Sequence, residues 1–216
     1  MILNNFKKRM ITSIFLFTLI SIIFYSTWIL TFSLIIISNL SIIEFFNLIK
    51  KINKKTFFVV LNNLCFIIYI FIFSVIFFIF SNLIQTKIII FLLLLCCVAS
   101  DIGGYIFGNI LKGPKLTKLS PKKTVSGAFG SLIFSGLFLG ITFNFLIDDK
   151  ILIFFVIGLI VSIFSQIGDI FFSYLKRKAK VKDSGKFLPG HGGFLDRVDS
   201  ILLGVPIGLI MLVIFL

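Results

Sequence analysis

The chain has 216 residues, of which 59% are hydrophobic and only 13% charged, whereas a typical soluble domain has roughly 25% charged residues. This composition and a mean hydropathy of +1.18 exclude a water-soluble enzyme and favour an integral membrane protein. The net charge is nevertheless +13, from 21 Lys and Arg against 8 Asp and Glu. Such a basic excess can mark a nucleic-acid surface, a topology signal or a binding site for anions.

The apolar stretches predict an all-α fold, a polytopic bundle of transmembrane helices with about seven spans, in a range of six to nine. The uncharged run 10–43 is much longer than the roughly 20 residues that cross a bilayer, so we expect two short helices with a turn near Ser26. The basic N-terminus and this run resemble a signal peptide, but without a small-residue cleavage site we expect an uncleaved anchor. The other expected spans are 57–80, 88–111, 125–147, 151–172 and 200–216.

The basic residues of the loops predict the orientation of these spans. With seven spans, nearly all Lys and Arg fall on one side of the membrane, and Lys87 and Lys150 fall on the other. Because basic residues mark cytoplasmic loops, we expect a cytoplasmic N-terminus and cytoplasmic loops at 112–124 and 173–199. We divide the chain into N-terminal transmembrane helices, residues 1–100, and a catalytic transmembrane region, residues 101–216.

The few acidic residues are informative because each can be placed. Asp101 and Asp169 lie inside apolar helices, where a carboxylate costs about 2.5–3.5 kcal/mol and therefore faces a cavity or a partner. Glu44 lies near the cytoplasmic end of the second span, and we expect it to snorkel or to pair with Lys50 or Lys51. Asp169 shares one helix face, through steps of three and four, with Ser162, Ser165, Gln166, Ser173 and Lys176. A polar contact between helices is the alternative explanation of this stripe.

The loop 173–199 combines basic residues, glycines and carboxylates. Its glycines allow backbone N–H groups to turn inward around an anion. Asp196 and Asp199 follow just before the last apolar run, where they could also simply favour the helix dipole. Basic groups, a glycine turn and carboxylates at a membrane edge suit metal-bound phosphates, because the cation and the basic side chains neutralise phosphate charge.

The loop 112–124 supplies a second basic set. We expect at least one of Lys122 and Lys123 to contact phosphate, and Thr124 to cap the next helix, while pure topology signalling is the alternative for the lysines. His191 is the only histidine, with no Cys or His set for zinc and no nucleophile motif beside it. Phosphate contact or loop ordering is therefore favoured for it over general-base work.

The pattern across 173–199 resembles the signature of phosphatidate cytidylyltransferases, also called CDP-diglyceride synthases. The matching positions are Ser173, Leu175, Lys176, Arg177, Lys182, Asp183, Gly185, Leu188, Pro189, His191, Gly192, Gly193, Asp196, Arg197 and Asp199. The segments around Asp101, Asp169 and 120–124 are also similar, so the resemblance covers about residues 101–204. The family often has an aromatic residue and an acid where Val125 and Ser126 stand here, and this chain is short on its N-terminal side.

The resemblance implies that CTP and phosphatidate give CDP-diacylglycerol and diphosphate, by in-line attack of the lipid phosphate on the α-phosphorus of CTP. It implies Mg²⁺ held by Asp169 and Asp196, with room for a second, monovalent cation, and Asp199, Lys176 and Arg177 as further catalytic residues. It implies a multi-pass protein of the bacterial inner membrane, in contact with membrane lipid, with a cytoplasmic active site and as a homodimer. The implied substrate-binding residues are Ser173, Lys122, Lys123, Lys182, Asp183, His191, Gly192, Gly193 and Arg197.

Two other functions are alternatives to this one. A CTP-dependent kinase of a polyprenol-type lipid would use a similar membrane site but leave CDP as its product. A transporter or lipid-binding scaffold would use intramembrane acids as an ion path, with acids spread through the bilayer and broken helices. Here the acids gather toward one face beside the glycine-rich basic loop. Nucleic acid is excluded as a partner, because no exposed domain with base-stacking aromatic residues is present.

Overall fold

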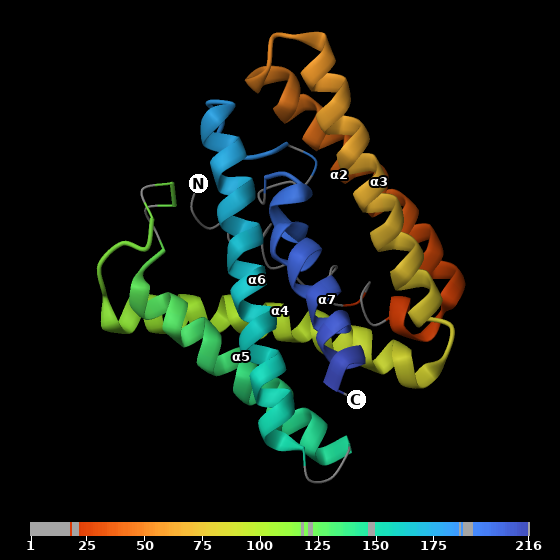
Figure 1. Cartoon of the computed structure of the whole chain (residues 1–216), viewed down its shortest axis with the longest axis vertical. Coiled ribbons are helices and arrows are strands. Elements are labelled where there is room, and N and C mark those ends of the chain that lie inside the picture. The colour runs from red at the N-terminus through yellow and green to blue at the C-terminus, as the bar shows by residue number, and fades with distance from the viewer. Residues whose placement is uncertain are drawn as a thin grey trace. The chain divides into compact units, whose positions relative to one another are not determined.

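The computed structural model describes residues 18, 22–117, 119–120, 123–146, 150–185, 187 and 192–215. Within them the chain is helical, and the only extended pairing described is an isolated bridge between Lys115 and Thr124. The helices are α2 (Thr27–Ile52), α3 (Thr56–Phe80), α4 (Ile84–Leu111), α5 (Val125–Leu146), α6 (Ile151–Lys178) and α7 (Leu195–Phe215) (Figure 1). All six are long and apolar enough to cross a membrane, which confirms the predicted all-α, polytopic transmembrane fold.

The break predicted in the first apolar run is confirmed. Ser26 has an extended backbone and caps α2, and its Oγ accepts a hydrogen bond from the N–H of Ile29 at 3.4 Å. Residues 22–25 before it are helical, and most of the span predicted upstream lies outside the described residues. The cytoplasmic position of the N-terminus stays a prediction.

Several predicted helix ends are wrong, because charged residues extend the helices beyond the apolar runs. Helix α2 ends at Ile52 with two lysines in its last turn, and α6 ends at Lys178 with three basic residues in its last turn. Lys and Arg are good helix formers and are favourable at a helix C-terminus. Helix α4 begins at Ile84, which places Lys87 inside it, and α7 begins at Leu195. The connection between α6 and α7 is therefore 179–194, shorter than the predicted loop 173–199.

The structure divides into two compact units, which are described separately below. Unit 1 contains residues 1–87 and 175–197, and unit 2 contains residues 88–174 and 198–216. Helices α4, α6 and α7 each contribute residues to both units. This is a division by packing, and the predicted division into residues 1–100 and 101–216 by role stays a prediction.

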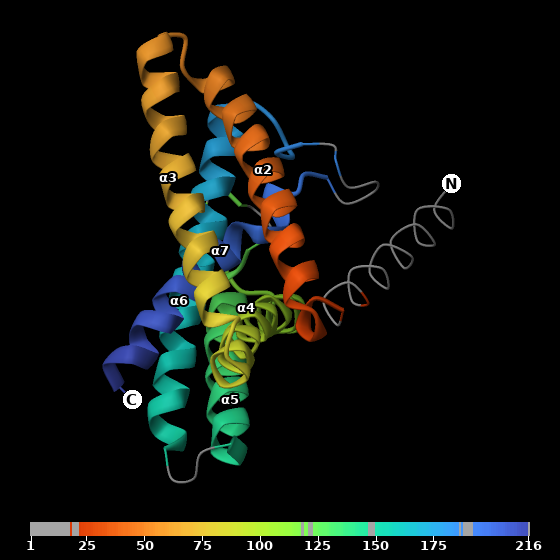
Figure 2. The same ribbon diagram turned by 90° about the vertical axis from the view of Figure 1, so that its right-hand side faces the viewer.

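In unit 1, helices α2 and α3 lie side by side and are joined by a short turn (Figures 1 and 2). The Oγ atoms of Ser38 and Ser74 are 2.8 Å apart, and the rings of Phe45 and Phe66 stack with centroids 3.9 Å apart. The buried face of α2 also includes Glu44, one turn from Leu48. Helix α2 therefore carries one buried acidic side chain in this unit.

In unit 2, helices α4, α5 and α6 pack closely through small residues and hydroxyl groups. A Cβ atom on Gly130 of α5 would lie 2.8 Å from the carbonyl oxygen of Gly103 in α4, so only glycine allows this approach. The Oγ atoms of Ser100 and Ser162 are 2.7 Å apart, and Nε2 of Gln166 donates to the carbonyl oxygen of Ala128 at 3.4 Å. Part of the polar stripe predicted on α6 thus makes helix–helix contacts.

Candidate functional site

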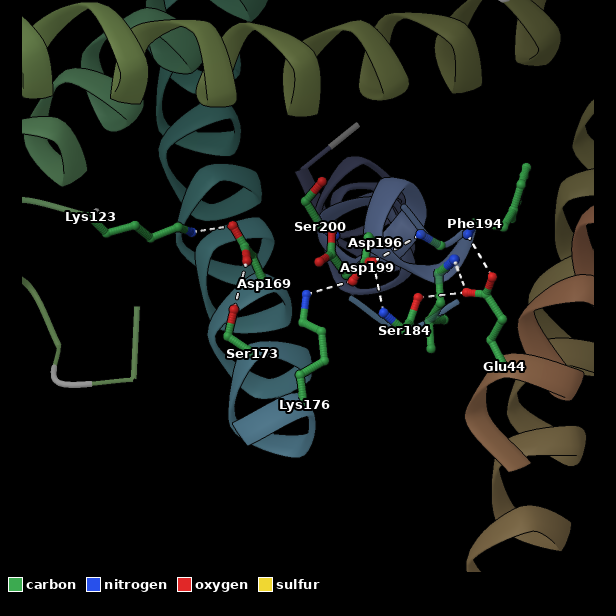
Figure 3. A network of polar contacts seen from close by, with 12 residues as sticks. Glu44, Lys123, Asp169, Ser173, Lys176, Ser184, Phe194, Asp196, Asp199 and Ser200 are labelled. Carbon is green, nitrogen blue, oxygen red and sulfur yellow. Dashed lines mark hydrogen bonds and ion pairs between the residues drawn. The ribbon is translucent and has the colours of Figure 1, made fainter. Parts of the chain in front are cut away.

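The first turn of α7 in unit 1 carries Asp196, whose carboxylate accepts hydrogen bonds from two backbone groups and one lysine. Oδ2 accepts from the N–H of Ser184 at 2.9 Å and from the N–H of Gly193 at 3.1 Å. Oδ1 accepts from Nζ of Lys176 at 2.6 Å (Figure 3). The side chains of Lys176 and Asp196 are each 12% exposed, so this ion pair is largely shielded from solvent. Asp196 thus ties the connection between α6 and α7 to the start of α7.

Glu44 of α2 accepts hydrogen bonds from the same segment, a role that the sequence analysis missed. Oε2 accepts from Oγ of Ser184 at 2.6 Å and from the N–H of Leu195 at 2.9 Å, and Oε1 accepts from the N–H of Phe194 at 2.9 Å (Figure 3). The residue is 1% exposed. The expected snorkelling or pairing with Lys50 or Lys51 is therefore wrong. The first N–H groups of α7 have no intrahelical acceptor, and Glu44 supplies one for two N–H groups at this end.

Two loop glycines are explained by close contacts around Glu44. A Cβ atom on Gly185 would collide with Oε1 of Glu44, and one on Gly193 would collide first with Oγ of Ser184 and would also lie 2.6 Å from Oε2 of Glu44. Backbone N–H groups of this segment do surround anions, as the glycines suggested. In the structure these anions are carboxylates of the protein itself, those of Asp196 and Glu44.

In unit 2, Asp169 of α6 lies in a second cluster. It forms an ion pair with Nζ of Lys123, and Oγ of Ser173 donates to its Oδ1 at 3.3 Å (Figure 3). The side chains of Lys123 and Asp169 are 27% and 26% exposed. Lys123 directly precedes Thr124, whose Oγ1 accepts from the N–H of Gly127 at 3.1 Å, which confirms the predicted helix cap. The start of α5 therefore positions the lysine that holds Asp169.

The remaining predicted site residues lie around these clusters in the sequence, and some of them fall outside the described residues. Asp199 is 7% exposed, and its Oδ1 accepts from the N–H of Ser200 at 2.9 Å. Gly192 has a φ of 85°, in the left-handed region that favours glycine. Lys122 and His191 lie outside the described residues. The exposed members of the predicted set are Arg177, Lys182, Asp183 and Arg197.

The structure brings the predicted residues together within each unit. Unit 1 joins Lys176 and Asp196, and unit 2 joins Lys123 and Asp169. Among the described residues no group of three or more His, Cys, Asp or Glu side chains gathers as a metal site. Mg²⁺ is usually bound through one or two carboxylates together with substrate phosphates. The two aspartates fit this donor type, and each already accommodates a cationic group. Their use by one metal ion stays a prediction, because they lie in different units.

Comparison with known proteins points to one family. The model of the family described as "Cytidylyltransferase family" matches residues 7–215. A phosphatidate cytidylyltransferase of Rickettsia bellii is 42% identical over 144 residues, covering 62% of this chain and 61% of the relative. One of Staphylococcus haemolyticus is 44% identical over 117 residues, covering 53% and 45%, and one of Helicobacter pylori (strain J99) is 41% identical over 115 residues, covering 52% and 42%.

The chain spans about half the length of the curated relatives it matches. The family model, in contrast, extends over nearly the whole chain and includes all six described helices. The resemblance found in residues 173–199 is thereby confirmed at the level of the family. We conclude that this chain belongs to the cytidylyltransferase family.

Proposed function

We propose that this chain is a phosphatidate cytidylyltransferase, a nucleotidyltransferase of phospholipid biosynthesis. The observation that carries the proposal is that relatives 41–44% identical to this chain are named phosphatidate cytidylyltransferases. The clusters around Asp169 and Asp196 support it, because carboxylates paired with lysines suit a reaction between two phosphates.

In this reaction an oxygen of the phosphatidate phosphate forms a bond to the α-phosphorus of CTP. The bond from that phosphorus to the bridging oxygen breaks, and diphosphate leaves with the electron pair. No covalent intermediate with the protein is needed, so positioning and charge neutralisation supply the catalysis. We assign charge neutralisation to Lys176, Arg177 and Lys123, with Asp199 as a further catalytic residue. We assign substrate contacts to Ser173, Lys122, Lys182, Asp183, His191, Gly192, Gly193 and Arg197.

The carboxylates of Asp169 and Asp196 are proposed to hold Mg²⁺. When bound, Mg²⁺ supplies Lewis-acid neutralisation of phosphate charge. Lys123 and Lys176 hold these carboxylates in the structure, and each can then offer its ammonium group to a phosphate oxygen. A second, monovalent cation belongs to the same proposal.

We place the protein in a bacterial inner membrane, with the site on the cytoplasmic face. Six helices able to cross a membrane and the bacterial relatives support this location. The basic residues near the ends of α2 and α6 support the orientation, since such residues mark cytoplasmic ends. CTP enters from the cytoplasm, and phosphatidate enters from the leaflet with its acyl chains left in lipid. The proposed assembly is a homodimer.

The test is a product assay with purified protein, phosphatidate, Mg²⁺ and CTP labelled at its α-phosphate. We expect the label to move to the lipid fraction on thin-layer chromatography, and only when phosphatidate and Mg²⁺ are both present. A CTP-dependent lipid kinase would instead leave the label in CDP. Label that stays in CTP or appears in CDP alone would contradict the proposal.

A further inference from the structure

We propose that Glu44 is a positioning residue for the transfer reaction. In this proposal, which rests on the proposed function, Glu44 holds Ser184, Phe194 and Leu195 and thereby sets the position of the Asp196 carboxylate. The residue belongs to the N-terminal half of the chain, outside the segment that carries the family signature. It does not contact Asp196 directly. Its effect passes through Ser184, whose hydroxyl group donates to Glu44 and whose backbone N–H donates to Asp196.

Glu44 is a charged residue buried in an apolar helix. Glu44 is 1% exposed within α2, and a buried carboxylate in such a helix is costly unless it has partners. Its described partners are the hydroxyl group of Ser184 and the N–H groups of Phe194 and Leu195, all uncharged. Because these N–H groups lie at the N-terminus of α7, the helix dipole also favours the negative charge.

Glu44 and Asp196 accept hydrogen bonds from the same or adjacent residues of the connection between α6 and α7. Ser184 donates through its hydroxyl group to Glu44 and through its N–H to Asp196. The N–H of Gly193 donates to Asp196, while the next two N–H groups along the chain donate to Glu44. Removing the Glu44 carboxylate therefore removes the hydrogen bonds that hold Ser184, Phe194 and Leu195, while the N–H groups of Ser184 and Gly193 are the backbone groups that hold Asp196.

The hydrogen bonds of Glu44 are distinct from the contacts that pack α2 against α3. All three hydrogen bonds described for Glu44 reach residues 184–195. The contacts described between α2 and α3 are made by other residues, including the Ser38–Ser74 hydrogen bond at 2.8 Å and the Phe45–Phe66 stack. Ser38→Ala is thus a matched control, since it removes a polar contact of the same helix in the same unit without touching the segment 184–195.

The experiment compares Glu44→Gln with Ser38→Ala and the wild-type protein. Glu44→Gln keeps the size of the side chain but loses its charge and places an amide N–H₂ among the donors. We expect kcat for CDP-diacylglycerol formation to fall about tenfold or more, with smaller changes in KM for CTP. We also expect faster trypsin cleavage after the exposed Lys182, because the chain two residues further on, at Ser184, loses its hydrogen bond to Glu44 and opens more often. Ser38→Ala should match the wild type in both measurements.

A double-mutant cycle with Gly185→Ala tests the contact itself. In the wild-type background the added Cβ atom collides with the Glu44 carboxylate, so we expect a large loss of kcat. In a Glu44→Ala background the space is free, and Gly185→Ala should then cost little more. Equal losses in the two backgrounds would overturn the proposed contact, because independent sites add.

The outcomes separate this inference from the proposed function. If wild-type protein transfers cytidylyl groups and Glu44→Gln matches it in kcat and in trypsin cleavage, the inference is overturned and the proposed function stands. If wild-type protein makes no CDP-diacylglycerol, the proposed function fails and the role of Glu44 in it fails too. Should Glu44→Gln not fold, Ser184→Ala keeps two of the three donors and should still lower kcat several-fold. Wild-type kcat in Ser184→Ala would then overturn the inference.

Discussion

Asp196 in unit 1 and Asp169 in unit 2 are the same type of side chain, but different kinds of group hold them. Asp196 accepts two backbone N–H groups and a lysine that is 12% exposed. The contacts described for Asp169 come from side chains, those of Lys123 and Ser173, and about a quarter of the aspartate side chain is exposed. The fold therefore sets the position of Asp196, whereas Asp169 can exchange its partners by side-chain rotation.

This difference has a physical consequence for a site that must take up a cation and phosphates. The backbone donors of Ser184 and Gly193 can move only if the chain at these residues moves, so Asp196 is preorganised, which favours catalysis by fixed charges. The ammonium group of Lys123 lies at the end of a flexible side chain and is partly solvated, so it can leave Asp169 at small cost. The position of the Asp196 carboxylate is thus fixed by the backbone, whereas the Asp169 carboxylate can change its partners.

The largest effect is expected for removal of either charge. Asp196→Asn and Asp169→Asn should each abolish Mg²⁺-dependent CDP-diacylglycerol formation, because an amide is a poor ligand for Mg²⁺. Both variants should still insert into the membrane. The labelled-lipid assay, normalised to the amount of protein in the membrane fraction, checks this. Turnover like that of the wild type in one variant would remove that residue from the proposed metal site.

A smaller effect that separates the two clusters is expected for the lysines. Lys176→Ala leaves a shielded carboxylate without its cation and should lower the free energy of unfolding by about 1–3 kcal/mol. Lys123→Ala affects a more exposed pair and should cost less than about 1 kcal/mol. Thermal unfolding in the same detergent measures both. Equal midpoints for the two variants would show that the clusters are held with similar strength.

Two hydroxyl groups form a matched pair, and one of them, that of Ser173, has the smallest expected effect of all. Oγ of Ser184 donates to Glu44 at 2.6 Å, a short hydrogen bond to a charged group, so Ser184→Ala should cost about 1.5–3 kcal/mol. Oγ of Ser173 lies 3.3 Å from Asp169, which is long for an O–H donor, and Ser173→Ala should cost about 0.5 kcal/mol. A larger loss in Ser173→Ala would reverse the comparison and argue that Asp169 is the more firmly held carboxylate.

Features that depend only on neighbouring residues could be predicted from the sequence. The break near Ser26 follows from the length of the uncharged run, which exceeds one span, and the cap at Thr124 follows from a hydroxyl group that can serve the first N–H groups of a helix. The ends of α2 and α6 differ from the predicted ones, because the uncharged runs end before the helices do. A helix continues through lysines when backbone hydrogen bonds and the dipole favour it.

The contacts of Glu44 could not be predicted from the sequence. Its hydrogen-bond partners lie 140 to 151 residues further along the chain, whereas Lys50 and Lys51 are plausible partners close by in the sequence. The sequence signal for this contact is the single acid of an apolar helix, Glu44, together with two glycines far along the chain, Gly185 and Gly193. Only in the folded chain do Gly185 and Gly193 meet the Glu44 carboxylate.

The sequence by itself determined that this protein spans a membrane with helices and that it belongs to the cytidylyltransferase family. Both follow from runs of adjacent residues, through apolar length and through a spaced signature, so no folding information is needed. The tertiary structure alone decided which donors hold Asp196, Asp169 and Glu44. Those pairings depend on burial and on the approach of distant segments, because a carboxylate removed from water takes whatever donors the packing brings to it.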